Sequence, residues 1–259
     1  MSITFAELHT MLAARPVRGT APNKAPDFLN DTERPLWQHL AEWRGGKAVT
    51  HPRQVFYAAS YGTQTAEVTK KYVVQMAQGE HAATRLGALG NCDVRVYEMD
   101  LNMPCAAALN ESTAAHAISY GLLAVEEGID LLLLGTLSAG AEKIMTELNE
   151  KLQQAKAADV LQLFAAMGGV DLCAALGAAL SARMALVPVI ADNQLTAILH
   201  RAISLLCDGN ENESPVVAAL PDTERFDAPL QPLATWYHVQ GLMALVPARP
   251  VLTTLSHAA

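Results

Sequence analysis

The chain has 259 residues, of which 51% are hydrophobic and 17% are charged. This composition supports a sizeable hydrophobic core and excludes a largely disordered chain. The formal net charge of −8 disfavours a basic groove for nucleic acid, so we expect no nucleic-acid partner.

The cysteines and the first residues of the chain set further limits. Cys92, Cys105, Cys173 and Cys207 are far apart and form no CxxC pair, which favours small buried side chains over a zinc site or a disulfide framework. The opening residues lack the basic and apolar regions of a signal peptide, and no apolar run approaches the roughly 20 residues that span a bilayer. We therefore expect a soluble cytoplasmic protein with no membrane partner.

The N-terminal part contains two predicted helices. Thr4 and Glu7 have the spacing of a capping box ahead of an apolar pattern, which predicts a helix over residues 1–14. A loop rich in Pro and Asn follows. Residues 36–43 form a second helical segment.

From residue 54 onward, short apolar strands alternate with helical patterns. Strands are predicted over 54–60, 93–101, 130–135, 186–192 and 216–220. Helices are predicted over 65–90 with an interruption at Gly79, then over 112–128, 141–158, 170–184, 194–206 and 248–255, with Ser112 as the N-cap of the second. The strands are continuous hydrophobic runs, which are typical of strands buried on both faces. The pattern therefore predicts an α/β protein with a doubly wound, mostly parallel sheet.

Several nucleotide and catalytic motifs are excluded. Gly135 and Gly140 have the spacing of a Walker loop, but Ala141 and Glu142 stand where that loop needs Lys and Ser or Thr. No G-x-G-x-x-G follows a predicted strand, and no HxH, HExxH or G-x-S-x-G occurs. We expect neither a bound metal nor a cofactor.

The predicted strand ends are the remaining candidates for a ligand site. Ligands of a doubly wound sheet bind beyond the carboxyl ends of its strands, and small or polar residues follow four of these ends, at 58–63, 99–102, 135–140 and 191–194. Backbone N–H groups at a helix N-terminus can hold an anion. The loop 135–140 fits both a phosphate site and a simple tight turn between packed elements.

Three segments together resemble one enzyme family. They are "MGGVDLCAALGAAL" (167–180) followed by "VPVIAD" (187–192), the helical stretch and strand over 67–101, and "LLGTLSAG" (133–140). In order and approximate spacing they resemble the nicotinate-nucleotide:dimethylbenzimidazole phosphoribosyltransferases, from about residue 45 to 225.

The resemblance implies an architecture and an activity. It implies a Rossmann-like sheet, a small helical subdomain from both chain ends, and a homodimer. We accordingly predict a helical segment over 1–45, an α/β core over 46–207, and a C-terminal segment over 208–259 that completes both parts. The implied reaction transfers ribose phosphate from nicotinate mononucleotide to dimethylbenzimidazole in the synthesis of the lower ligand of cobalamin, with small nucleotides and bases as ligands.

The resemblance also implies site residues. The substrate-binding candidates are Gly135, Thr136, Ser138 and Gly140 in the phosphate loop, Ser60 and Tyr61 after the first strand, Gly168, Gly169 and Asp171 in the Gly-Gly helix, and Asp192 at a strand end. Glu224 is the candidate catalytic base. Asp192 also suits the N-cap of the next helix, and Lys143 and Arg183 are the nearest cations for a phosphate.

The sequence departs from the family at this site. Thr136 and Ser138 replace Glu and Gly of the family's loop, Glu142 brings a negative charge to the following helix start, and a Lys-containing segment is missing. Three hypotheses remain. One is a divergent phosphoribosyltransferase, and another is a catalytically impaired paralogue that acts as a binding or partner subunit. The third is an unrelated α/β enzyme that binds a nucleotide or sugar phosphate at the same strand ends.

Overall fold

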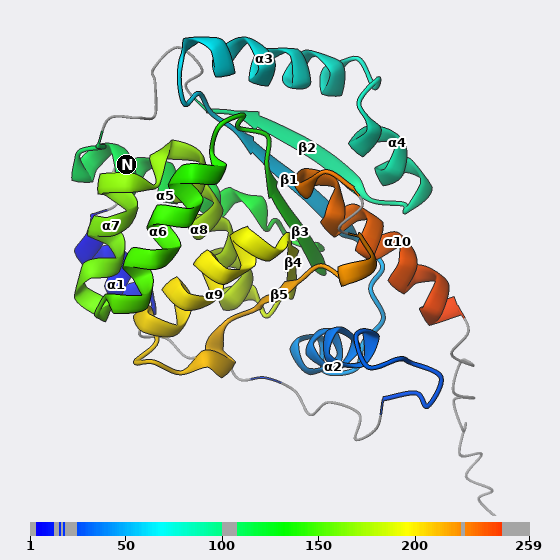
Figure 1. Cartoon of the computed structure of the whole chain (residues 1–259). Helices are drawn as coiled ribbons and strands as arrows, with labels where there is room; N and C mark the ends of the chain where they lie inside the picture. Colours follow the sequence, from blue (N-terminus) through cyan, green and yellow to red (C-terminus); the bar gives the residue numbers. More distant parts are fainter. Residues whose placement is uncertain are drawn as a thin grey trace, which may run out of the picture.

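A computed structural model describes residues 4–12, 16, 18, 25–99, 108–223 and 226–244 (Figure 1). Within these residues, five parallel strands form one sheet in the order β2-β1-β3-β4-β5. The strands are β1 (Pro52–Ala58), β2 (Asp93–Glu98), β3 (Leu131–Thr136), β4 (Val189–Ala191) and β5 (Val216–Ala218). The strand order reverses at β1, so the topological switch point lies between β1 and β3.

The helices lie on both faces of this sheet. They are α1 (Phe5–Leu12), α2 (Glu33–Arg44), α3 (Thr63–Ala77), α4 (Ala82–Leu89), α5 (Glu111–Gly121), α6 (Glu142–Gln154), α7 (Val160–Met167), α8 (Gly169–Ala185), α9 (Asn193–Leu206) and α10 (Gln231–Ala244). Helices α1 and α5 to α9 pack on one face, whereas α2, α4, α10 and the end of α3 pack on the other (Figure 1). This arrangement confirms the predicted doubly wound α/β fold.

The alternation of strand side chains explains the continuous apolar runs. Leu132 and Leu134 of β3 join the core beneath α5 to α9, while Leu131 and Leu133 join the core beneath α2, α4 and α10. Successive strand residues point to opposite faces. Since both faces are covered, every position of β1 and β3 is buried.

Helices α5 and α8 cross with their backbones in direct contact. A Cβ atom at Gly121 would lie 1.9 Å from the carbonyl oxygen of Ala174, and one at Gly177 would lie 1.9 Å from that of Ile118. No side chain fits at either position. The two glycines therefore set the closeness of this helix pair, which forms the centre of the larger core.

Most predicted elements are confirmed. The predicted interruption at Gly79 separates α3 from α4, and Gly79 has φ +73°. The N-cap of α5 is Asn110 and not Ser112, because the Asn110 side chain accepts a hydrogen bond from the Thr113 N–H at 2.8 Å. Helices α7 and α10 were not predicted. The predicted helix over 248–255 lies outside the described residues, and the proposed division into segments stays a prediction.

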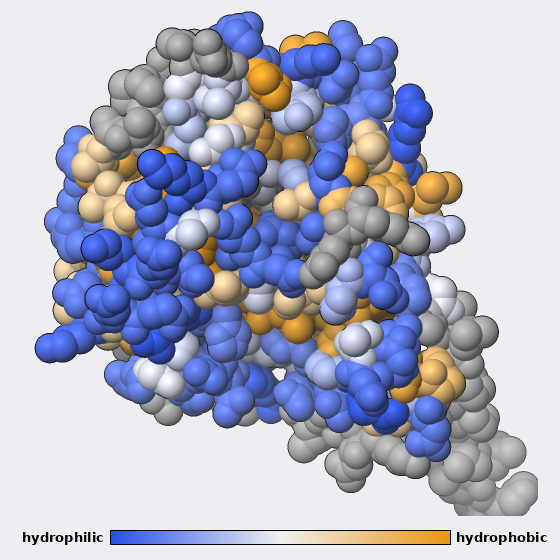
Figure 2. Space-filling view, in the orientation of Figure 1, coloured by the Kyte–Doolittle hydropathy of each residue, from blue (hydrophilic) through white to orange (hydrophobic). Residues whose placement is uncertain are grey.

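The surface is mixed in character. Hydrophilic residues cover most of the face that α6 and α9 present, and hydrophobic residues appear between them in smaller groups (Figure 2). Within the described part of the chain, no helix combines the length and apolar character needed to cross a membrane.

Candidate functional site

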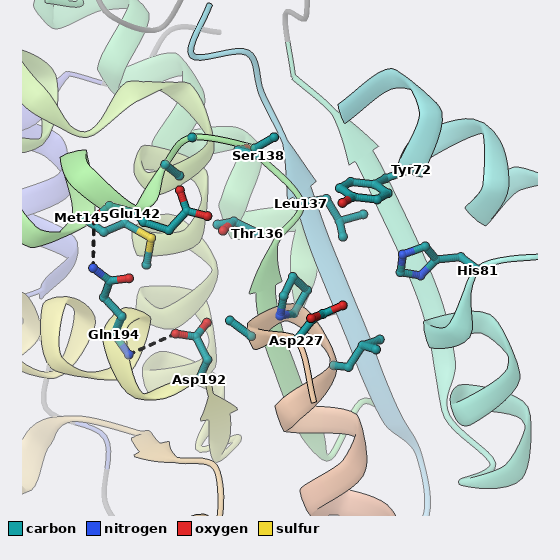
Figure 3. Close-up of a pocket in the computed structure, with 16 residues that line it drawn as sticks. Tyr72, His81, Thr136, Leu137, Ser138, Glu142, Met145, Asp192, Gln194 and Asp227 are labelled. Carbon is teal, nitrogen blue, oxygen red and sulfur yellow. Dashed lines mark hydrogen bonds between the residues drawn. The ribbon is translucent and has the colours of Figure 1, made fainter. Parts of the chain in front are cut away.

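A cavity of about 370 Å³ opens at the carboxyl ends of β3 and β4 (Figure 3). Its walls come from the loop after β3, the starts of α4, α6 and α9, the second half of α3, and the segment before α10. The lining residues are Tyr72, His81, Thr136, Leu137, Ser138, Ala139, Gly140, Ala141, Glu142, Met145, Asp192, Gln194, Asp227, Ala228, Pro229 and Leu230. The cavity thus lies where a doubly wound sheet binds its ligands, beside the switch point.

The loop after β3 is fixed by hydrogen bonds to its neighbours. The Ser138 hydroxyl oxygen accepts from the Ala59 N–H at 2.8 Å, and the Ala139 N–H donates to the Thr69 hydroxyl at 3.1 Å. The Ala141 N–H donates to the carbonyl of Ser138 at 3.2 Å. Polar groups of this loop are therefore already engaged within the protein.

Gly140 shapes the same loop through its backbone. Its φ is +85°, a conformation that L residues with side chains rarely adopt, and an added Cβ would lie 3.1 Å from the Thr65 side chain. A glycine at this position is explained by the turn and by the packing of α3. Its presence does not require a ligand.

Behind this loop lies a buried carboxyl group. Asp171, in the first turn of α8, is fully buried, and its Oδ1 accepts from the Tyr61 hydroxyl at 2.6 Å. Burial raises the pKa of Asp171, while hydrogen bonds from Ser138 and Tyr61 act in the opposite direction. Through these hydrogen bonds, the Asp171 carboxyl group connects the start of α8 with the segment after β1 and the loop after β3.

Asp192 brings a second carboxyl group to the cavity wall itself. Its Oδ1 accepts from the backbone N–H groups of Gln194 and Leu195, each at 3.0 Å, and so caps α9 as predicted. Burial raises the pKa of Asp192, and these two backbone donors oppose that shift. Figure 3 shows the carboxyl group at the edge of the cavity.

Two further carboxyl groups, those of Glu142 and Asp227, complete an acidic wall. Glu142 begins α6, and its carboxylate points into the cavity toward Thr136 (Figure 3). Asp227 precedes the short turn at residues 228–230. Together with Asp192, these two side chains form what we call the acidic wall.

The side of the cavity that faces Asp192 and Glu142 is aromatic, and Asp227 lies next to it (Figure 3). His81 and Tyr72 meet edge to face, with ring centroids 5.8 Å apart. The His81 Nδ1 accepts from the Ala83 N–H at 3.2 Å, which leaves the proton of the neutral ring on Nε2. Burial lowers the pKa of His81, and the charge of Asp227 acts in the opposite direction. This wall offers a flat ring surface and one N–H donor.

The structure brings some of the predicted residues together at the cavity. Thr136, Ser138, Gly140 and Asp192 line it. Ser60, Tyr61, Gly168, Gly169 and Asp171 do not line it. Tyr61 instead contacts both Asp171 and the carbonyl oxygen of Gly168, 3.2 Å away. The role of all these residues in binding stays a prediction.

Other predicted residues have packing roles or fall outside the structure. Gly135 lies within β3, where an added Cβ would come within 3.1 Å of the Phe56 ring. The Arg183 side chain is 1% exposed and pairs with Glu213 at 2.9 Å, so it is not placed to reach a phosphate at the cavity. Glu224 lies outside the described residues.

The aromatic side chains Tyr72 and His81 and the carboxyl group of Asp227 were not predicted as site residues. His81 and Asp227 are far apart in the chain and belong to no motif, so only the fold brings them together. The described residues include no group of three or more His, Cys, Asp or Glu side chains placed to hold a metal ion.

No family model matches the chain. Among curated proteins, it is similar to the nicotinate-nucleotide–dimethylbenzimidazole phosphoribosyltransferase of Agrobacterium fabrum, at 24% identity over 252 residues that cover 78% of this chain and 73% of that protein. The enzyme of the same name from Sinorhizobium fredii is 28% identical over 70% of this chain and 67% of its own length.

Solved structures share the fold. An enzyme of the same name from Thermus thermophilus superposes with a TM-score of 0.58 at 18% identity, over 83% of this chain and 80% of that one. CobT from Thermus thermophilus superposes with a TM-score of 0.60 at 16% identity, over 92% and 86% of the two chains. The chain is therefore a relative of the nicotinate-nucleotide–dimethylbenzimidazole phosphoribosyltransferases, as its three motif segments indicated.

Proposed function

We propose that this protein transfers ribose phosphate from nicotinate mononucleotide to dimethylbenzimidazole. The similarity to curated enzymes of that name, over 78% of the chain in the Agrobacterium comparison, is the observation that carries the proposal. The cavity supports it, because it lies at the carboxyl ends of β3 and β4 and includes the loop that resembles the family's phosphate loop. From the resemblance we also propose a homodimer that works in the cytoplasm.

The reaction needs two substrates that are correctly aligned with each other and one group that accepts a proton. A ring nitrogen of the base attacks the anomeric carbon, the bond from that carbon to nicotinate breaks, and nicotinate leaves with the electron pair. The proton on the other ring nitrogen passes to a carboxylate. We assign this acceptor role to Glu224 from its place in the sequence.

The cavity walls provide the positioning. The rings of Tyr72 and His81 and the apolar side chains of Leu137 and Met145 suit a flat heterocycle. Asp192 accepts a hydrogen bond from the bound substrate with the oxygen that does not cap α9. Holding the two reactants in register in this way contributes to the rate.

A turnover assay with nicotinate mononucleotide and dimethylbenzimidazole tests the proposal. We expect Glu224→Gln to lower kcat by about a hundredfold, the usual contribution of a general base. Asp192→Asn keeps the helix cap, because Asn is an equally good N-cap, so a raised KM would report the lost acceptor oxygen and its charge and not a lost fold.

The control is Asp31→Asn, since Asp31 is exposed and does not line the cavity. If Glu224→Gln forms product at the wild-type rate, Glu224 is not the general base. No product from the wild-type protein, with base binding intact, would instead indicate a binding or partner subunit. Light scattering tests the dimer, and a monomer at all concentrations would contradict it.

A further inference from the structure

The described lining of the cavity carries negative charge without a balancing positive charge. It includes the three carboxylic side chains of the acidic wall and no Lys or Arg. Lys143, the lysine nearest in sequence to the loop after β3, is 86% exposed and pairs with Glu147 at 3.7 Å. A ligand with separate charged groups is therefore bound most favourably when its cationic part faces the acidic wall.

One carboxyl group of the acidic wall has an oxygen left for a ligand. Asp192 is 5% exposed, and its Oδ1 accepts the two backbone N–H groups at the start of α9. Its Oδ2 has no hydrogen-bond donor among the residues that the structure describes, and the group lies at the edge of the cavity (Figure 3). A positive charge in the cavity would compensate this oxygen for the water that it lost on burial.

The side of the cavity that faces this oxygen is suited to a cation. Tyr72 and His81 form it, and Asp227 lies next to them. Burial lowers the pKa of His81 from its ordinary value of 6.5, so the ring is neutral at pH 7 and does not repel a cation. The face of a tyrosine ring attracts a positively charged nitrogen. An aromatic ring and a carboxylate thus lie side by side at this cavity.

From these observations we propose that the cavity recognises the positive charge of an N-ribosyl pyridinium ring, mainly through Tyr72 and Asp227. The proposal rests on the proposed function for the identity of the ligand, because nicotinate mononucleotide has a quaternary pyridinium nitrogen. It places the ring of this nucleotide, and not its phosphate, against the two side chains. The product has a neutral benzimidazole ring once its proton has left, so the same contacts favour the substrate over the product.

The expected discrimination is modest because both side chains contact solvent. Asp227 is exposed and Tyr72 is half-buried. An ion pair at an exposed position changes affinity by about threefold, since solvent and salt screen it. The contact between the cation and the Tyr72 ring contributes about threefold more. A cationic ring should therefore bind about tenfold more tightly than a neutral ring of the same shape.

Nicotinate mononucleotide and its 1,4-dihydro form test the proposal by calorimetry with the full-length protein. The two probes share the ribose, the phosphate and the carboxylate, and they differ in the charge of the ring. We expect the wild type to bind the oxidised form about tenfold more tightly than the reduced form. Asp227→Asn and Tyr72→Leu should each lower this ratio about threefold, by weakening the binding of the oxidised form alone.

Each variant has a matched control. Asp222→Asn removes the same charge as Asp227→Asn, but Asp222 is exposed and does not line the cavity. Tyr72→Phe keeps the aromatic face that Tyr72→Leu removes. Both controls should keep the wild-type ratio of affinities.

The turnover assay separates a failure of this inference from a failure of the proposed function. Equal affinities of the wild type for the two forms, or an unchanged ratio in either Asp227→Asn or Tyr72→Leu, would overturn the inference even if product is formed. The expected ratios without any product would support the inference and refute the transfer reaction. Failure of both forms to bind would refute the two together.

Discussion

Replacing His39 by glutamine should make the protein less sensitive to acid. His39 lies on α2, and its Nε2 is 2.7 Å from the carbonyl oxygen of Pro215, immediately before β5. Burial lowers the pKa of His39 from 6.5 to about 4; the hydrogen bond to Pro215 opposes this shift, and the positive charge of Arg18 adds to it. Folding therefore favours the neutral ring.

The sign and size of the effect follow from proton linkage. Between pH 6.5 and pH 4 the unfolded chain binds a proton at His39 that the folded protein does not. The free energy of unfolding must then fall as the pH falls through this window, with full stability retained above it. A shift of this size is worth about 3 kcal/mol, at about 1.4 kcal/mol per pH unit. Glutamine keeps an N–H donor for Pro215 but does not titrate.

Urea unfolding at about pH 7 and about pH 4 measures the difference. We expect the wild type to lose about 3 kcal/mol more than His39→Gln over this range. Burial also lowers the pKa of His81, but His81 is present in both proteins and cancels. The control is His116→Gln, an exposed position on α5. Equal acid losses in the wild type and His39→Gln would refute the reasoning.

Three further predictions use the same unfolding assay. Asp171→Asn should gain stability relative to the wild type as the pH rises above about 4. Burial raises the pKa of Asp171, so its ionisation costs folding free energy in the wild type. A difference in the free energy of unfolding between the two proteins that stays constant with pH would contradict this. Gly177→Ala should lower the free energy of unfolding by about 1–3 kcal/mol, since its methyl group meets the carbonyl of Ile118. Glu213→Ala should cost about 3 kcal/mol, because it removes the carboxylate paired with the buried Arg183; no loss would show that this pair is not stabilising.

Much of the fold was predictable because its signals are local. The strands of a sheet covered on both faces must be apolar at every position, so their sequence marks them directly. A helix start could be predicted where a side chain caps the first turn of its own helix, as Thr4 and Asp192 do. Helix α10 was missed because its sequence contains Pro and Gly and lacks a clear apolar stripe. Its position is set instead by Trp236, which is buried against the sheet and donates to the carbonyl of Gly90.

The site was less predictable because its contacts are long-range. Ser138 has the residue type of a ligand donor, yet its oxygen accepts from Ala59, 79 residues away in the chain. His81, at the start of α4, and Asp227, before the turn at residues 228–230, reach the same cavity from distant parts of the chain. No local pattern encodes either arrangement, because each depends on the order of the strands in the sheet.

The residues of the loop after β3 and those of the acidic wall differ in how strongly they indicate a function. Packing and internal hydrogen bonds explain Gly140 and Ser138 without any ligand, so a resemblance at these positions is a resemblance of fold. Asp192 differs from them. Its capping role would be served equally by a neutral Asn, and burial makes its charge unfavourable. Because the helix cap does not need that charge and burial disfavours it, we propose Asp192 as the first residue of this cavity to test for substrate binding.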